Sequence, residues 1–372
     1  MEKSTVAVMF GGLSSEKEVS LATGRYVYSI IDRNRYEVIP VYMSSSSGKL
    51  YIIPDKLVIQ NKTEDIEKRL SEAEYIKLEN LKSKCDVVFI ALLGKYGEDG
   101  VIQGILELLN IPYTGSGILP SAVAMNKKVT KNLLRSMSIT VAKDFIVTYD
   151  NWQNSSDQIV NEIQSSIGFP VVVKPTREGS SVGVSFTNDI ESLKKGINSA
   201  FEWDKEIIVE EYIKGQEFMC IVIGNKDPVA MIPTEAEFTG EIFTYDGKYM
   251  PGRARYHTPP RNCPQEKIQE IREIAVKAYE AIGVKGFGRV DGFITNDKII
   301  IGEVHTGTIM VPSSYVFQQA SRADFGVGKL KGGINGKNKG IKGGTGFSPR
   351  ALVTTFIDLA IDAHNNKKGT LI

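Results

Sequence analysis

A stretch rich in glycine and serine, KPTREGSSVGVSF at 174–186, contains residue types that bind phosphate groups. Backbone N–H groups of consecutive Gly and Ser residues can point at phosphate oxygens, and the Lys174 ammonium supplies a positive charge. The stretch lies between two short β-like runs, whereas the Walker A loop and the dinucleotide fingerprint both open a helix. It is therefore either an ordinary surface hairpin or a hairpin loop that folds down over a nucleotide.

Two later segments carry ionisable residues at a spacing of two. RVDGF places Arg289 two residues before Asp291, and GEVHT places Glu303 two residues before His305. Residues two apart on a strand share a face, so both pairs can converge on one face of a sheet. Two carboxylates near a phosphate loop suit a magnesium nucleotide, because Mg²⁺ takes oxygen ligands together with substrate phosphates. Seen alone, each pair could equally be a solvated surface ion pair.

A third motif, VEEYIKGQEF at 209–218, places Glu210 at the end of a predicted strand and Glu217 after an apolar and aromatic connection. This pattern suits an adenine held by backbone polar groups, with a carboxylate on the ribose hydroxyls. The order of the three motifs along the chain makes a nucleotide site the favoured interpretation.

The composition is that of an ordinary soluble globular protein. The 372 residues are 42% hydrophobic and 24% charged with a formal net charge of +1, which indicates small-molecule partners, no nucleic acid and no membrane surface. The apolar runs VAVMF and VVFIALL are too short for a signal peptide or a membrane span. Three cysteines without CxxC spacing indicate a reducing compartment. These features predict a cytoplasmic protein.

The elements that must position these motifs fall into three predicted domains. Residues 1–120 read as buried strands at 6–10, 36–43 and 85–93 alternating with helices, which is typical of a doubly wound parallel sheet. A cationic helix at 126–137, another at 189–203 and closely spaced strands predict a small mixed α+β domain at 121–213. Its strands are expected at 168–175, 181–186 and 206–213, and a further strand is expected just after the domain, at 217–224.

The remaining residues, 214–372, predict a second α+β domain. A long helix is expected at 265–282, paired strands at 286–295 and 298–306, and a final helix at 347–364 with Ser348 as its N-cap. The segment 323–347 is dominated by Gly and Lys and cannot bury enough apolar surface to order itself, so it predicts a flexible insertion. An anion-binding arm is the alternative for this segment.

Taken together, the motifs resemble those of the D-alanine:D-alanine ligase family of ATP-grasp enzymes. The similarity runs through GGLSSEKEVSLATG, GKYGEDGVIQGILELLNIPYTGSG, NKKVTK, VVVKPTREGSSVGVS, VEEYIKGQEF, YDGKY, GFGRVDGF and GEVHT, and it leaves out only the Gly- and Lys-rich segment. The resemblance implies an ATP-grasp fold of the α/β and α+β classes, with an N-terminal doubly wound (pre-ATP-grasp) domain. It also implies a homodimer.

The implied reaction is the ATP-dependent joining of two D-alanines to D-alanyl-D-alanine through an acyl phosphate, for peptidoglycan precursor synthesis. The implied cofactors are ATP and two Mg²⁺ or Mn²⁺ ions. Such a phosphoryl transfer depends mostly on positioning and charge neutralisation, so cations matter more than nucleophilic side chains.

The resemblance assigns roles residue by residue. The nucleotide contacts would be Lys127, Lys174, Ser180, Ser181, Glu210, the backbone of Glu211 and Ile213, Glu217 and Lys248. The catalytic and amino-acid contacts would be Glu16, Ser180 and Tyr249 around the first ammonium, Arg289 at the tetrahedral intermediate, and Glu98, Ser314 and Tyr315 toward the second substrate. The metal ligands would be Asp291, Glu303 and His305.

Five positions depart from the family pattern. His305 replaces an asparagine ligand, which favours Mn²⁺ or a transition metal because imidazole is softer than an amide oxygen. The others are Ile309 for glycine, Tyr315 for leucine, Leu93 for histidine and Asn126 for aspartate. Most of these lie on the substrate side. Two alternatives therefore stay open: a related ligase with another amino acid pair, and a nucleotide-binding regulatory protein that has lost ligation.

Overall fold

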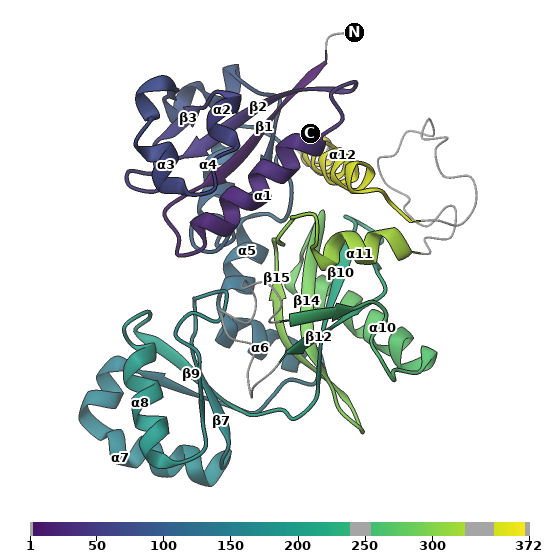
Figure 1. Ribbon diagram of the computed structural model, residues 1–372. Coiled ribbons are helices and arrows are strands. Elements are labelled where there is room, and N and C mark those ends of the chain that lie inside the picture. The colour runs from purple at the N-terminus through teal and green to yellow at the C-terminus, as the bar shows by residue number, and fades with distance from the viewer. Residues whose placement is uncertain (1–2, 239–253, 324–345, 369–372) are drawn as a thin grey trace.

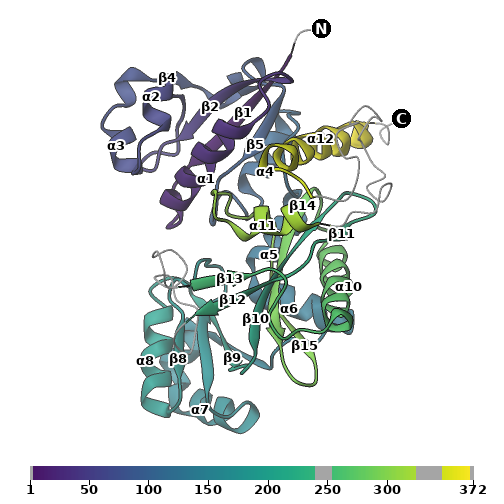
Figure 2. The same cartoon turned by 45° about the vertical axis from the view of Figure 1, so that its right-hand side comes forward.

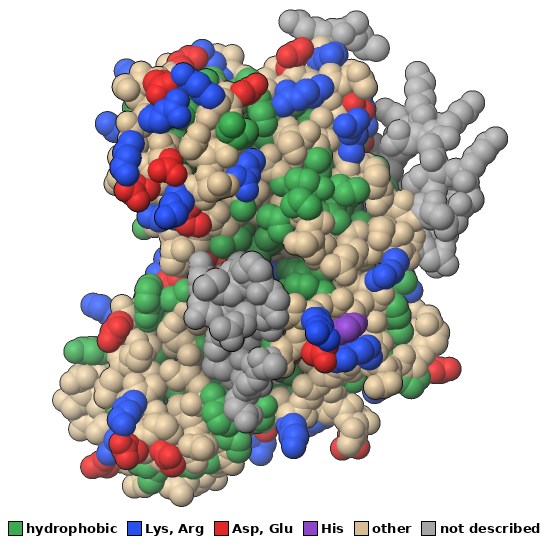
Figure 3. Space-filling view, in the orientation of Figure 1, with side chains coloured by type: hydrophobic (Ala, Val, Ile, Leu, Met, Phe, Trp, Pro, Cys, Tyr) green, Lys and Arg blue, Asp and Glu red, His purple; other side chains and the backbone are tan. Residues whose placement is uncertain are grey.

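The computed structural model describes residues 3–238, 254–323 and 346–368. Figure 1 shows an N-terminal α/β domain at the top, a small central domain at the bottom and a C-terminal domain beside and between them. On the face shown in Figure 3, basic and acidic side chains are interspersed over the N-terminal domain. In the part of the chain that the structure describes, no helix is both long and apolar enough to span a membrane.

The N-terminal domain is built on a five-stranded sheet in the order β4-β3-β2-β1-β5. Its centre is β1 (Ser4–Gly11), which pairs in parallel with β2 (Tyr36–Met43) and β5 (Val87–Ile90). The run from Val6 to Phe10 is fully buried, as expected of a parallel strand that is covered on both faces. The doubly wound arrangement predicted for these three strands is therefore confirmed.

Two further strands of this sheet differ from the prediction of a parallel sheet. β3 (Leu50–Ile52) and β4 (Glu74–Ile76) are antiparallel to their neighbours. The connection from β2 to β3 is a tight turn, and a parallel pairing would need a crossover of a dozen or more residues. The short helices α2 (Asp55–Val58) and α3 (Thr63–Glu67) follow β3.

Helix α1 (Lys17–Ile30) lies directly on the first strand of the sheet, as Figure 2 shows. At their crossing, a Cβ atom on Gly24 would stand 2.4 Å from Cβ and Cγ of Phe10. Only glycine permits this approach. The helix begins beside Glu16, so the packing of α1 also fixes the place of that side chain. Helix α4 (Val101–Leu108) belongs to the same domain.

The central domain has an antiparallel sheet in the order β6-β9-β7-β8, covered by two helices. The elements are β6 (Asp144–Thr148), α7 (Tyr149–Ser166), β7 (Val171–Pro175), β8 (Ser185–Thr187), α8 (Ile190–Ala200) and β9 (Glu206–Glu211). The predicted hairpin over 174–186 is present as β7 and β8. Helix α7 is not part of the sequence prediction. Trp152 of α7 and Ile163 lie in a hydrophobic core of this domain's own.

The C-terminal domain has an antiparallel sheet in the order β13-β12-β10-β14-β15. Its strands are β10 (Gln216–Ile223), β11 (Val229–Ala230), β12 (Thr234–Phe238), β13 (Ala254–His257), β14 (Phe287–Ile294) and β15 (Ile299–His305). The strand expected at 217–224 is β10, which pairs with β14 along its whole length and so lies in the domain predicted at 214–372.

Three helices pack on the C-terminal sheet: α5 (Ile118–Met125), α6 (Lys127–Ser136) and α10 (Gln265–Ile282). Leu134 of α6 and Ile139 share a hydrophobic core with the apolar side chains of α10, β14 and β15. The sequence prediction placed these residues at the start of the central domain. The apolar stripe of α6 instead faces the C-terminal sheet, so residues 121–139 are structurally part of the C-terminal domain.

Helices α11 (Tyr315–Arg322) and α12 (Pro349–Lys368) connect the C-terminal and N-terminal domains. Phe356 of α12 stacks on Phe287 with ring centroids 4.1 Å apart, and Asp358 accepts hydrogen bonds from Arg35 and Tyr36. Figure 2 shows α12 between the two domains. The hydrophobic core that contains Phe356 runs through both of them.

Most of the predicted insertion at 323–347 lies outside the described residues, which leave out 324–345. Both flanks meet at one atom, because the Ala320 carbonyl accepts from Ala323 N at 3.3 Å and from Phe347 N at 2.8 Å. The predicted N-cap is confirmed, since Ser348 Oγ accepts from Ala351 N at 3.3 Å.

Candidate active site

A cavity of about 680 Å³ lies where the three domains meet. The predicted site residues that line it from the nucleotide side are Lys127, Lys174, Glu210, Glu211, Ile213 and Glu217. Those on the strands β14 and β15 are Arg289, Asp291, Glu303 and His305. Those near the N-terminal domain are Glu16, Glu98, Ser180, Ser181 and Tyr315. Lys248 and Tyr249 lie outside the described residues.

Three lysines face two carboxylates on the nucleotide side of the cavity. Lys174 Nζ is 2.8 Å from Glu210 Oε2 and 3.7 Å from Glu303 Oε1. Lys127 Nζ is 3.8 Å from Glu303 Oε1, and Lys131 Nζ is 2.5 Å from Glu210 Oε1. The lysines come from α6 and from the end of β7. They form a concentrated positive region in which phosphate oxygens can be bound.

Burial and pairing shift the pKa values of this group strongly. Burial alone would raise the pKa of Glu210, but Lys131 and Lys174 outweigh it and lower that pKa to about 2. Burial would likewise lower the pKa of Lys174, but Glu210 and Glu303 raise it. Glu210 is therefore ionised at neutral pH, and Lys174 keeps its charge inside the cavity.

The paired strands β14 and β15 place four ionisable side chains on one face. Arg289 is directly opposite His305, and Asp291 is opposite Glu303. His305 Nε2 is 3.3 Å from Asp291 Oδ2 and 3.3 Å from Glu303 Oε2. Arg289 Nε donates to both oxygens of Asp291, at 2.8 and 3.0 Å. The expected convergence on one face is confirmed.

The electrostatics of this face suit cation binding. Burial would raise the pKa of Asp291, but Arg289 and His305 outweigh it and lower that pKa. Burial would also raise the pKa of Glu303, but Lys127, His305 and Lys174 lower it. Burial and Arg289 would lower the pKa of His305, but the two carboxylates raise it. Both carboxylates are therefore ionised at neutral pH.

The donor set fits a divalent cation that is shared with a nucleotide. Among the residues with described positions, no three or more His, Cys, Asp or Glu side chains are arranged to hold a metal ion by themselves. Mg²⁺ does not require such a cage, because it is usually held through one or two carboxylates together with substrate phosphates and water. Asp291 and Glu303 supply the carboxylates, and His305 stands between them.

Glu16 lies between the N-terminal domain and the connection 176–184, which we call the β7–β8 loop. Ser180 Oγ donates to Glu16 Oε1. Ser180 and Ser181 both have positive φ, 49° and 62°, a conformation that non-glycine residues keep only where surrounding contacts hold it. The arrangement brings the predicted ammonium-binding carboxylate to the tip of the predicted phosphate loop.

Three of the five residues that depart from the expected pattern lie on the side of the cavity predicted to take the amino acids. Leu93, Ile309 and Tyr315 all line it, and Arg289 donates to the Tyr315 hydroxyl at 2.6 Å. Ser314 does not line the cavity; its Oγ accepts from Val311 N at 2.8 Å in the turn before α11. Tyr315 therefore presents the polar group that this turn contributes to the cavity.

Two residues of the site were missed by the sequence analysis, Lys131 and Glu178. Lys131 follows Lys127 by four residues on α6, and that spacing places both on one helix face, so it could have been found. Glu178 receives the ammonium of Lys95 from the N-terminal domain. No local pattern in the sequence predicts that contact.

Comparisons with known proteins agree with this geometry. The family models described as D-ala D-ala ligase N-terminus and C-terminus match residues 5–116 and 133–330. A D-alanine–D-alanine ligase of Carboxydothermus hydrogenoformans is 37% identical over 320 residues, covering 86% of this chain and 92% of that protein.

Solved structures extend the similarity. The VanG D-Ala:D-Ser ligase of Enterococcus faecalis has a TM-score of 0.79 and 30% identity, covering 96% of this chain and all of that one. The Bacillus anthracis D-alanine–D-alanine ligase complexed with ATP has a TM-score of 0.70 and 25% identity, with 98% and 99% covered. The fold, the cavity and both family models lead to one assignment: the chain belongs to the D-alanine–D-alanine ligase family.

Proposed function

We propose that this protein joins two D-alanines to D-alanyl-D-alanine, with conversion of ATP to ADP and inorganic phosphate, for peptidoglycan precursor synthesis. The observation that carries the proposal is the single cavity in which Lys127 and Lys174 face Asp291 and Glu303, with Glu16 on the opposite side. Relatives with this name are identical to the chain at 34 to 37% of the aligned residues. An ATP complex of a family member supports the nucleotide.

The reaction is divided among the side chains of the cavity. Lys127 and Lys174 bind phosphate oxygens, while Glu16 holds the ammonium of the first D-alanine. A carboxylate oxygen of that D-alanine attacks the γ-phosphorus of ATP. The bond between the γ-phosphorus and the oxygen that bridges to the β-phosphate breaks, and ADP leaves. A divalent cation held by Asp291 and Glu303 would neutralise charge on the phosphates.

In the second step the amine of the other D-alanine attacks the carbonyl carbon of the acyl phosphate. The amine loses a proton. The bond between the carbonyl carbon and the oxygen that carries the phosphoryl group breaks, and inorganic phosphate leaves. Arg289 is placed to stabilise the oxyanion that forms on the way, a role in which fixed charges contribute most because they need no reorganisation. Its pKa stays high despite burial because Asp291 and Tyr315 raise it, so the guanidinium remains charged.

The test is ATP-dependent phosphate release measured with a panel of D- and L-amino acids, together with mass spectrometry of the dipeptide. Release that is maximal with D-alanine, and a D-alanyl-D-alanine product, are expected. Release with none of the amino acids would contradict the proposal and support a nucleotide-binding regulatory protein. Running the panel with Mg²⁺ and Mn²⁺ separately tests whether His305 favours Mn²⁺.

A second candidate is a ligase with another acceptor. The VanG D-Ala:D-Ser ligase is a similar structure, at 30% identity, and the side of the cavity predicted to take the amino acids presents the Tyr315 hydroxyl, 3.4 Å from Thr308 Oγ1. Two hydroxyls can bind a polar acceptor side chain. Competition between D-alanine and D-serine as acceptors separates the candidates: a product that is mainly D-alanyl-D-serine favours the second.

We further infer a homodimer and a cytoplasmic location. Leu108 and Leu119, which are 86% and 72% exposed, lie on α4 and on the neighbouring α5 and give an apolar surface that a second copy could cover. Sedimentation velocity tests this inference, and a Leu108→Glu, Leu119→Glu variant that sediments as the native protein does would oppose it.

A further inference from the structure

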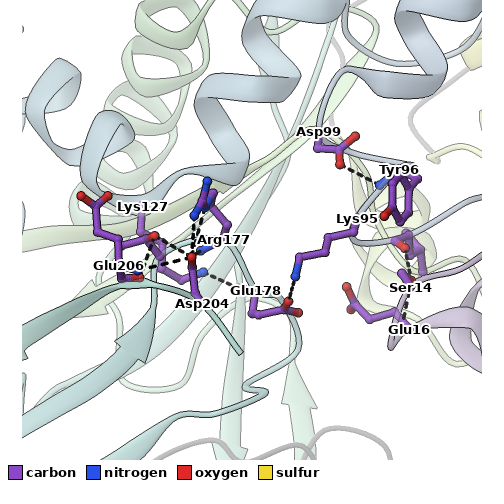
Figure 4. A network of polar contacts seen from close by, with 12 residues as sticks. Ser14, Glu16, Lys95, Tyr96, Asp99, Lys127, Arg177, Glu178, Asp204 and Glu206 are labelled. Atoms are coloured by element: carbon purple, nitrogen blue, oxygen red, sulfur yellow. Dashed lines mark hydrogen bonds and ion pairs between the residues drawn. The ribbon is translucent and has the colours of Figure 1, made fainter. Parts of the chain in front are cut away.

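An ion pair joins the N-terminal domain to the β7–β8 loop at the edge of the cavity. Lys95 Nζ contacts Glu178 Oε1, and Figure 4 shows the two side chains pointing toward one another. The Glu178 side chain is 6% exposed and that of Lys95 is 41% exposed. The carboxylate is thus buried at a domain junction and receives its partner from the other domain.

On both sides of this junction, the segment that carries the charged residue is held by hydrogen bonds within its own domain. In the loop at 94–100, Gly94 N donates to Glu98 Oε2 at 2.7 Å and Tyr96 N donates to Asp99 Oδ2 at 2.8 Å. These bonds fold the loop on itself, so Lys95 extends from a fixed backbone. Its reach toward Glu178 does not depend on ordering a flexible segment first.

The start of the β7–β8 loop is anchored in the central domain. Asp204 accepts from Thr176 Oγ1 at 2.8 Å, and from Arg177 N at 3.0 Å and Arg177 Nη2 at 2.6 Å. Figure 4 shows this cluster on the other side of Glu178 from Lys95. The loop is therefore fixed at its base by Asp204, while its far side is held by contacts to the N-terminal domain.

Glu16 is enclosed by the residues next to the ion pair. A Cβ atom on Gly94 would stand 2.5 Å from Glu16 Oε2, and one on Gly179 would stand 2.7 Å from the same oxygen. Gly94 precedes Lys95, and Gly179 follows Glu178. The two backbones can approach the Glu16 carboxylate this closely only because both residues are glycine.

Glu178 also contacts the predicted phosphate-binding group. Lys127 Nζ donates to the Glu178 carbonyl at 2.6 Å. When Lys127 turns to phosphate oxygens, this carbonyl loses its donor. The side-chain pair with Lys95 then remains to hold Glu178 against the N-terminal domain.

We propose that Lys95 and Glu178 are positioning residues that hold the β7–β8 loop closed across the cavity, and thereby set Ser180 against Glu16. This inference rests on the proposed function only for its effect on turnover. An exposed ion pair contributes little to stability, but a carboxylate that is buried at a domain junction is costly to leave unpaired. Loss of Lys95 therefore favours the open loop.

The kinetic test compares Lys95→Met with Lys84→Met. Lys84 pairs with Glu74 within the N-terminal domain and is 38% exposed, so it matches Lys95 in exposure but lies on no loop of the cavity. For Lys95→Met we expect KM for ATP to rise about five- to tenfold, between the effects of exposed and buried pairs, with kcat changed by less than about twofold. Lys84→Met is expected to behave as the native protein.

Two further variants exclude a merely structural effect. Lys95→Arg keeps the charge and is expected to restore KM to within about twofold of the native value. Glu178→Gln is expected to raise KM as Lys95→Met does, and the double variant should raise it no further, because both changes break one interaction. Additive losses, or a native KM in Lys95→Met, would overturn the proposal.

A ligand-free test separates the clamp from the reaction. Trypsin can cut after Arg177 when the loop opens, and mass spectrometry identifies the fragment 1–177. Cleavage is expected to be about fivefold faster in Lys95→Met than in Lys84→Met, because the open population rises. Equal rates would refute the clamp even in an active enzyme. A protein without ligase activity that still shows the faster cleavage would sustain the clamp and refute the proposed function alone.

Discussion

At the scale of single residues, the site is organised by charges that are buried together. Glu210 is shared by Lys131 and Lys174, so the carboxylate holds two ammonium groups at fixed positions beside the phosphate region. Because their charges are already inside the protein, the lysines need little rearrangement to meet a phosphate.

Lys174→Ala is expected to abolish turnover, lowering kcat/KM by at least about a hundredfold, because one of the charges that neutralise the transferring phosphoryl group is lost. Phosphate release and nucleotide binding by calorimetry measure the effect. Lys194→Ala serves as the control, since Lys194 pairs with the exposed Asp157 on the outside of the central domain. Unchanged turnover in Lys174→Ala would remove the β7–β8 loop from the phosphate site.

Glu210→Gln is expected to destabilise the protein in a pH-dependent way. The pKa of Glu210 is about 2 in the folded chain against 4.5 for the free side chain, so the stability that it contributes is present above about pH 4.5 and is lost as the pH falls toward 2. The variant should lose about 3 kcal/mol at pH 7, since one member of a buried pair is removed.

The difference from the native protein should shrink by about 1 kcal/mol between pH 6 and pH 3.5. Urea unfolding at the two pH values measures it, with Glu191→Gln on the surface of α8 as the control. A difference that stays constant or grows as the pH falls would show that Glu210 does not carry its charge in the folded state.

The residues could be predicted where the signal was local. Arg289, Asp291, Glu303 and His305 were placed on one face because a strand repeats every two residues. The position of Glu178 in the site could not be predicted, because its partner Lys95 lies in another domain. Nothing in the sequence around Glu178 specifies where that domain will dock.

At the scale of elements, glycines decide how closely helices approach the sheets. Gly24→Ala is expected to lower the free energy of unfolding by about 1–3 kcal/mol, because the new methyl group would overlap Phe10 at the crossing of α1 and β1. Gly104→Ala in α4 is the matched control, since its new Cβ would meet only the end of Ile118 at 3.8 Å.

The control should instead raise stability by up to about 1 kcal/mol, because alanine loses less backbone freedom than glycine on entering a helix. Urea unfolding of both variants gives the comparison. If both changes are equally mild, α1 does not pack on β1 as closely as described.

Elements with a clear period were predicted well. The helix at 265–282 and the strands of β14 and β15 follow the pattern of apolar residues. Helix α7 was missed because its sequence is rich in Asn, Gln and Ser, and it buries few side chains, among them Trp152 and Ile163. The antiparallel β3 was missed because three residues are too short to show alternation.

At the scale of the whole molecule, one hydrophobic core joins the N-terminal and C-terminal domains, while the central domain has its own. Phe356→Ala is therefore expected to lower the free energy of unfolding of the joined N-terminal and C-terminal domains by about 3–5 kcal/mol, and that of the central domain far less. The chain has two tryptophans, Trp152 and Trp203, and both belong to the central domain.

Unfolding followed by far-UV circular dichroism should shift to lower urea in Phe356→Ala, while the tryptophan transition should move less. Ile163→Ala, which opens the core of the central domain, should do the reverse. Coincident shifts by both probes in both variants would mean that the chain unfolds as one cooperative unit.

The domain boundary near residue 121 could not be predicted for a reason that also belongs to this scale. Helix α6 is amphipathic, and amphipathicity says that a helix has a buried face without saying which sheet will cover it. The next element in the sequence is the central strand β6, but the apolar side of α6 meets α10 and β15.

Ala323 N and Phe347 N both donate to the Ala320 carbonyl, so the described residues on either side of 324–345 are held at nearly one point. Chain length between such adjacent ends costs little, growing only with the logarithm of the number of residues. Because the two anchored ends stay adjacent, a change in the number of residues between them is expected to alter the free energy of unfolding by less than about 1 kcal/mol, which urea unfolding measures.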